Sequence, residues 1–187
     1  MLCLGCGRWG DDLCRACRQN LIGAPDRLLA SGLLVRSCFE HAGVAKTVVH
    51  AFKYQGSDRA GWLLARALTC LLPPTGALVP LPRASWRTVT YGVDPARELA
   101  KKVSALTGRE TWMGLQPPLH SSAQAGRVRT ERDPPAFTVS EEPPSDLILI
   151  DDVVTTGRTL MSAQRSLGQR DRPKPVLLAL SATATSD

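Results

Sequence analysis

One stretch near the carboxyl end of the chain reads Leu147-Ile148-Leu149-Ile150-Asp151-Asp152-Val153-Val154-Thr155-Thr156-Gly157-Arg158-Thr159. Its four aliphatic residues predict a strand that is buried on both faces, as in a parallel sheet. Two carboxylates fall at the end of that strand, and the hydroxyl-bearing residues and glycine after them predict a loop that opens a helix. The stretch therefore predicts an α/β fold with a polar loop at the edge of its sheet.

The side chains of this loop suit a sugar phosphate. Asp151 and Asp152 accept hydrogen bonds from vicinal hydroxyls, while residues 155–159 offer backbone N–H groups, hydroxyls and a helix N-terminus to a phosphate. The alternative is an ordinary strand, turn and helix whose acidic pair is solvated. Adjacent carboxylates repel each other unless cations or hydroxyl donors offset the repulsion, so the pair favours a binding site.

Length and composition narrow the class of protein. The chain has 187 residues, which is enough for one α/β domain with a small appendage. No run approaches the roughly 18 to 20 apolar residues that a membrane span needs. Residues 1–6 lack the basic and apolar regions of a signal peptide. We therefore expect a cytoplasmic protein in a reducing environment, without structural disulfides.

The net charge of +6 is concentrated in the middle of the chain. Residues 83–132 contain nine basic side chains (Arg83, Arg87, Arg97, Lys101, Lys102, Arg109, Arg127, Arg129 and Arg132) against four acidic ones (Asp94, Glu98, Glu110 and Glu131). This excess suits a polyanionic ligand, whether a diphosphate or a nucleic acid. A basic, solvated surface is the alternative for any single residue of the set.

The N-terminal segment carries two identical dithiol turns, Cys3-x-x-Cys6 and Cys14-x-x-Cys17. Together they supply the four thiolates of a tetrahedral structural zinc site. A redox dithiol usually sits at a helix N-terminus after a strand, and disulfides conflict with a reducing compartment. The segment is too short to bury a core, so we expect metal binding to supply its folding free energy.

The remaining pattern divides the chain into a zinc ribbon over residues 1–22, a linker over 23–32 and one main domain over 33–187. Predicted strands begin at 33, 77 and 176, and predicted helices cover 44–52, 58–72, 95–107 and 158–167. Lys53, at the end of a helix, faces either a phosphate or solvent. Trp62 and Trp112 are predicted to lie in the core, Cys38 and Cys70 to be packing residues, and the long polar loop 119–144 to form a mobile lid.

The order of these motifs resembles one family. The paired cysteine turns come first, Val79-Pro80-Leu81-Pro82 lies in the middle, and residues 147–159 match the phosphoribosyl diphosphate (PRPP) signature at all thirteen positions. Lys53-Tyr54-x-Gly56, Gln124 and Glu131-Arg132 extend the match. The chain thus resembles the ComF family of competence-protein-like phosphoribosyltransferases. The resemblance implies a type I phosphoribosyltransferase fold, a mostly parallel sheet flanked by helices, behind an N-terminal zinc ribbon.

The resemblance also implies roles for individual residues. Asp151 and Asp152 would engage the ribose hydroxyls, and the 5-phosphate would be held by Thr155, Thr156, Gly157, Arg158 and Thr159. The diphosphate of PRPP, bound with Mg²⁺, would lie against Pro80, Leu81, Pro82 and Arg83, with Lys53 facing a phosphate. The flexible catalytic loop would contribute Arg127, Arg129 and Arg132.

Three functions remain open on the sequence. The first is Mg²⁺-dependent phosphoribosyl transfer to a nucleobase, in nucleoside metabolism. The second is a non-catalytic accessory of DNA uptake in natural competence, which would bind single-stranded DNA, stack bases on Trp9, Trp86 and Tyr91 and work beside a DNA-uptake helicase. The third is a regulator that binds PRPP without turnover, because Tyr91-Gly92-Val93-Asp94-Pro95 stands where family members often have Arg-Gly-Phe-Asn-Gln.

Overall fold

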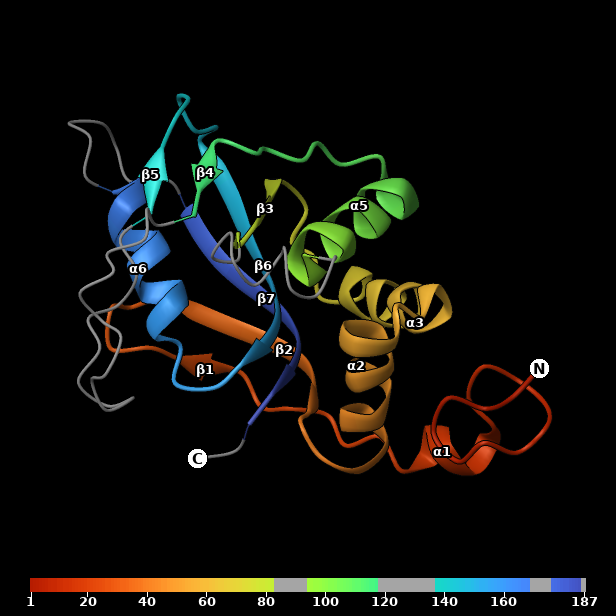
Figure 1. Cartoon of the computed structure of the whole chain (residues 1–187). Helices are drawn as coiled ribbons and strands as arrows, with labels where there is room; N and C mark the ends of the chain where they lie inside the picture. Colours follow the sequence, from red (N-terminus) through yellow and green to blue (C-terminus); the bar gives the residue numbers. More distant parts are fainter. Residues whose placement is uncertain (83–93, 118–136, 169–175, 186–187) are drawn as a thin grey trace, which may run out of the picture.

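The computed structural model describes residues 1–82, 94–117, 137–168 and 176–185. Its centre is a five-stranded sheet with helices on both faces (Figure 1). The strand order is β1 (Arg27–Leu28), β2 (Leu34–Glu40), β7 (Val176–Ala184), β6 (Asp146–Val154) and β3 (Ala77–Pro80). Only β1 runs antiparallel to its neighbour, and the other pairs are parallel. The predicted α/β class with a mostly parallel sheet is confirmed.

Strand β6 occupies the interior of the sheet, as its aliphatic sequence predicts. It pairs with β7 on one side and β3 on the other. The side chains of residues 147–150 are at most 1% exposed. A strand covered on both faces and paired along both edges leaves water only at its ends, so polar side chains belong at its carboxyl end.

Among the described elements, three helices cover one face of the sheet and one helix covers the other. The first group is α2 (Gly43–Gln55), α3 (Asp58–Thr69) and α5 (Pro95–Thr107), and the helix opposite is α6 (Arg158–Leu167). The ends of these helices follow local chemistry. Ser57 and Asp94 accept backbone N–H bonds as N-caps, and Gly56 and Gly108 end α2 and α5 in the left-handed conformation.

The connections of β3 and β6 diverge to opposite faces of the sheet. The helix that follows β3 among the described elements is α5, which packs on the α2–α3 face, whereas α6 follows β6 and packs on the other face. Adjacent parallel strands whose connections part in this way leave a crevice beyond their carboxyl ends, where α/β proteins bind ligands. Asp151 and Asp152 lie at that end of β6, and Pro80 to Pro82 lie at that end of β3.

The segment predicted as a linker, residues 23–32, belongs to the main domain. Arg27 and Leu28 form β1, which pairs with Val35 and Leu34 of β2. Leu29 is 8% exposed and packs into the core on the α6 face. A two-residue edge strand among glycine and proline carries no recognisable period-2 pattern, which is why the sequence does not reveal it.

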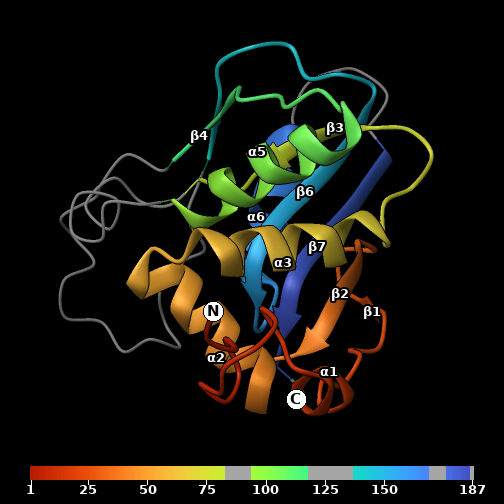
Figure 2. The same cartoon turned by 90° about the vertical axis from the view of Figure 1, so that its right-hand side faces the viewer.

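The N-terminal ribbon contains the short helix α1 (Arg15–Gln19) and lies against α2 and α3 (Figure 2). Cys3, Leu13 and Cys17 are buried and join the same hydrophobic cluster as residues of α2 and α3. The expectation that this segment has no core of its own therefore needs one correction. Metal binding is not the sole source of its stability, because part of its apolar surface is covered by the main domain.

The two tryptophans that were predicted as core residues differ. Trp112 is 6% exposed and buried as expected, packing beside the small pair β4 (Leu115–Gln116) and β5 (Thr138–Val139). Trp62 lies half-buried on the surface of α3, where its Nε1–H donates to Asp58 at 3.0 Å. The ammonium of Lys102 sits 4.7 Å from the Trp62 ring centroid. The helical spacing places Trp62 on a flank of α3 rather than on its core stripe.

We predict that Gly61→Ala in α3 lowers the free energy of unfolding. Alanine is favoured over glycine within a helix by about 1 kcal/mol, but a Cβ here would lie 2.9 Å from Cε2 of the buried Phe52 ring. The resulting overpacking should outweigh the helix preference and cost roughly 1 to 3 kcal/mol in urea unfolding. In a Phe52→Leu background the same change should cost less. A stabilised Gly61→Ala protein would contradict this packing argument.

Candidate functional site

The four N-terminal cysteines converge on one point. The Sγ atoms of Cys3, Cys6, Cys14 and Cys17 all lie within 4.8 Å of one another. Sγ of Cys6 and Sγ of Cys14 are 3.7 Å apart, close to the roughly 3.8 Å between thiolates around a tetrahedral zinc with Zn–S bonds of about 2.3 Å. The donor set and its spacing therefore fit a metal ion such as zinc.

The two dithiol turns are held in place by their own backbone. The N–H of Cys14 donates to Sγ of Cys3 at 3.3 Å, and this bond is the largest cause of a lowered pKa for Cys3, about 6. Burial raises the pKa of the Cys17 thiol to about 12, with the neighbouring thiols adding to the rise. A bound cation would offset the desolvation of the Cys17 thiolate, since metal ligands are deprotonated on binding.

We predict that Cys6→Ser removes the metal. Serine has no thiolate to complete the tetrahedral set, so metal content should fall from about one ion per chain to near zero, measured by elemental mass spectrometry of protein purified without chelator. Cys70→Ser is the matched control, because Cys70 is exposed at the end of α3 and lies outside the cluster. Full metal content in the Cys6→Ser protein would contradict the assignment.

The acidic pair at the end of β6 is asymmetric. Asp152 is buried, and its Oδ2 forms a salt bridge with Nζ of Lys53 at 2.8 Å. The two side chains are 7% and 13% exposed, so this ion pair is largely shielded from solvent. Lys53 belongs to the last turn of α2. The structure thus brings Lys53 to the acidic pair rather than into solvent.

Asp151 has a different environment. Its Oδ1 accepts from the backbone N–H of Asp152 at 2.8 Å. Burial raises the pKa of Asp151 to about 8, and the charge of Asp152 adds to the rise. Desolvation and the neighbouring charge thus both make ionisation of Asp151 costly in the folded chain.

A row of buried polar residues crosses the sheet beside Asp151. In register, Asp151 pairs with Ser181 of β7, which pairs with Ser37 of β2. The two serine hydroxyls are 2.7 Å apart, and Thr183 Oγ1 is 2.9 Å from Nδ1 of His41. Burial, followed by the charges of Lys53 and Lys46, lowers the pKa of His41. Sequence reasoning missed this row, although hydroxyl residues after an aliphatic strand are the available signal.

The loop after β6 has the backbone that the sequence predicts. Gly157 adopts φ 71°, and a Cβ there would lie 2.7 Å from two methyl carbons of Leu29. Thr155, Thr156, Arg158 and Thr159 are exposed around the start of α6. The N-cap residue Gly157 makes no side-chain bond to the start of α6, although the N–H of Arg158 donates to Oγ1 of Thr156 at 3.5 Å.

Arg27 is a second residue that sequence reasoning missed. Its Nη2 donates to the carbonyl oxygen of Thr155 at 2.5 Å, which places a guanidinium beside the loop. An isolated arginine in a segment rich in glycine and proline carries no motif that would indicate this position.

The segment at the end of β3 runs beside the acidic pair. Pro80 pairs with Ile150, and the N–H of Leu81 donates to the Ile150 carbonyl at 2.9 Å. The side chains of Pro80, Leu81 and Pro82 are buried. A contact between a ligand and these residues would therefore involve backbone atoms.

Several predicted residues lie outside the described part of the chain: Arg83, Arg127, Arg129 and Arg132, together with Trp86, Tyr91, Gln124 and most of the loop predicted as a lid. Trp9, the third predicted stacking residue, is 83% exposed on the ribbon. Two hollows of the described surface lie elsewhere, on either side of Arg59 between the ribbon and the helices of the main domain.

The chain matches no protein-family model, and no curated protein matches it significantly. In the described residues, no helix has the length and apolar character required to cross a membrane.

We predict that Asp151→Asn flattens the dependence of stability on pH. A folded-state pKa of about 8 against an ordinary value of 3.8 means that the folded chain holds a proton which the unfolded chain releases. Wild-type stability should therefore fall as pH rises through this window, by at most about 1.4 kcal/mol per pH unit from this group. Asparagine cannot ionise, so the variant should lose this part of the fall.

Urea unfolding at several pH values across that window measures both slopes. Asp146→Asn is the control, because Asp146 starts the same strand at its opposite end. Equal slopes in wild type and Asp151→Asn would show that Asp151 does not hold a proton in the folded chain.

Proposed function

We propose that this chain has a type I phosphoribosyltransferase fold, binds PRPP with Mg²⁺ and transfers the phosphoribosyl group to a nucleobase. The observation that carries the proposal is the placement of Asp151 and Asp152 toward the carboxyl end of β6, beside the end of β3, followed directly by the glycine loop that opens α6. The resemblance to the ComF family supports the same conclusion.

The loop after β6 is suited to the 5-phosphate. Exposed threonine hydroxyls, backbone N–H groups and the start of α6 provide donors for an anion. The guanidinium of Arg27 adds a positive charge beside Thr155. Gly157 allows the close approach of Leu29, so the loop is supported from below by the main core.

The acidic pair is suited to the ribose. Lys53 balances the charge of Asp152 at 2.8 Å. Vicinal ribose hydroxyls would add hydrogen-bond donors to the carboxylates, which stabilises their charged forms in a buried setting. Binding of the sugar should therefore favour ionisation of Asp151 and strengthen the pair as a hydroxyl acceptor.

The proposed reaction needs no covalent nucleophile from the protein. A ring nitrogen of the base forms a bond to C1 of the ribose as the bond from C1 to the diphosphate oxygen breaks, and the nitrogen loses its proton to solvent. Positive charge develops on the ribose, where Asp151 and Asp152 stabilise it electrostatically. Mg²⁺, when bound, would neutralise charge on the departing diphosphate.

The cysteine cluster has a separate role in this proposal. Four thiolates leave zinc no open position for a substrate, so we assign it a structural function. It stabilises the ribbon, which packs on α2, the helix that also carries Lys53.

We predict that the wild-type protein binds PRPP in the presence of Mg²⁺. Asp152→Asn should weaken this binding at least about tenfold, because the side chain that accepts from the ribose hydroxyls and pairs with Lys53 loses its charge. Isothermal titration calorimetry measures both. Asp146→Asn, the same change at the other end of β6, should bind as tightly as wild type.

Absence of wild-type binding at millimolar PRPP would refute the proposal. Release of diphosphate on addition of a nucleobase would establish turnover. Tight PRPP binding without diphosphate release in the presence of any nucleobase would instead favour a regulator that binds PRPP without turnover.

A further inference from the structure

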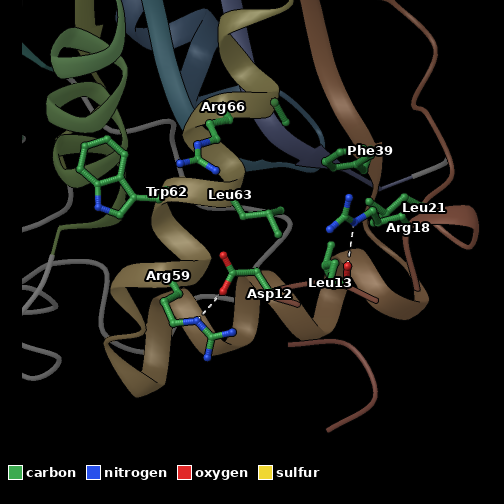
Figure 3. Close-up of a pocket in the computed structure, with 10 residues that line it drawn as sticks. Asp12, Leu13, Arg18, Leu21, Phe39, Arg59, Trp62, Leu63 and Arg66 are labelled. Carbon is green, nitrogen blue, oxygen red and sulfur yellow. Dashed lines mark hydrogen bonds and ion pairs between the residues drawn. The ribbon is translucent and has the colours of Figure 1, made fainter. Parts of the chain in front are cut away.

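A groove separates the zinc ribbon from α3. It has a volume of about 460 Å³ and is bounded by residues of the ribbon, of α3 and of the end of β2 (Figure 3). The salt bridge from Arg59 to Asp12, at 2.5 Å, forms one of its walls. Arg59 also donates to the carbonyl of Leu2 at 2.9 Å. These contacts hold the two sides of the groove at a defined separation, because they join the ribbon directly to α3.

The floor of the groove is apolar. Leu13 is buried beneath it, and Leu63 points from α3 toward Leu13 and Asp12 (Figure 3). Leu21, Phe39 and Leu63 remain half-buried along its length. The ribbon therefore packs against α2 and α3 without covering this floor. Half-buried aliphatic and aromatic side chains in a hollow are suited to receive an apolar anchor.

The rim of the groove is positively charged. Its lining includes three arginines, Arg18, Arg59 and Arg66, and one carboxylate, Asp12. Arg59 pairs with Asp12, and Arg18 reaches the exposed Asp11 at 3.3 Å. Arg66 is exposed, and among the described residues its guanidinium has no hydrogen-bond or ion-pair partner. The rim thus offers an uncompensated cation beside an apolar floor.

The geometry distinguishes between two kinds of anionic partner. Binding of single-stranded nucleic acid relies on aromatic faces that stack bases. The tryptophan of this groove, Trp62, points away from the ribbon (Figure 3), and its ring is covered by the ammonium of Lys102 from α5. Apart from the half-buried Phe39, the floor consists of aliphatic side chains, which offer no stacking surface. An apolar anchor flanked by carboxylates satisfies both the floor and the rim.

We propose that the groove between the zinc ribbon and α3 binds a segment of a partner protein that carries an aliphatic or aromatic anchor flanked by aspartate or glutamate. The anchor packs on Leu63 and Phe39, and the acidic groups pair with Arg66 and Arg18. This site is on the ribbon side of α3 and is separate from the acidic pair of β6, so it can act whether or not PRPP is bound.

The test is a selection from a phage-displayed library of random peptides against the full-length, metal-loaded protein. The enriched peptides are expected to combine an aliphatic or aromatic residue with flanking acidic residues. As synthetic peptides in fluorescence anisotropy, they should bind Arg66→Glu and Leu63→Ser at least about tenfold more weakly than wild type. Arg165→Glu reverses the charge of an exposed arginine on α6, away from the groove, and this matched control should bind the peptides as tightly as wild type does.

Metal content and PRPP binding of each variant show whether it is folded, and PRPP binding also tests the proposed function separately. A selection that enriches no acidic peptide would overturn the proposal, as would selected peptides that bind Arg66→Glu as tightly as wild type. Labelled oligothymidine that binds wild type but neither Arg66→Glu nor Leu63→Ser would overturn it too, and would assign the groove to nucleic acid.

Discussion

The desolvation of two adjacent carboxyl groups at the end of a buried strand governs the arrangement of this protein. Residues 147–150 are almost fully buried, so the chain meets polar surroundings only where Asp151 and Asp152 begin. The ammonium of Lys53 pairs with Asp152, whereas burial, with the charge of Asp152 adding to it, raises the pKa of Asp151. The neighbouring strands add hydroxyl groups at the same level of the sheet.

This requirement links α2 to the sheet. Lys53 reaches Asp152 from the last turn of α2, and the same helix packs on the N-terminal ribbon. Gly5 of the ribbon leaves room for Sγ of Cys17 and for Val44 of α2, where a Cβ would lie 2.7 and 3.1 Å from those side chains. The ribbon and the acidic pair are therefore connected through one packed helix, and the stability of each depends on its position.

Much of the architecture follows from local sequence. Asp94 and Gly108 bound α5 where capping rules place them, and the helix after Gly157 begins and ends as predicted. The predictions that were wrong concern packing between distant segments. Trp62 lies on a flank of α3, and the supposed linker contains an edge strand and the buried Leu29. Periodicity gives no information on such contacts because each depends on a partner far away in the chain.

The sequence alone determined the α/β class, the four-cysteine cluster and the acidic pair followed by its glycine loop, because each of these depends on residue types within a short span. The tertiary structure alone decided that Lys53 meets Asp152, that Arg27 reaches Thr155 and that Ser37, Ser181 and His41 lie beside the pair. It also created the groove at Arg66. These features join side chains from separate elements, and only the packing of helices on both faces of one sheet brings such residues within bonding distance.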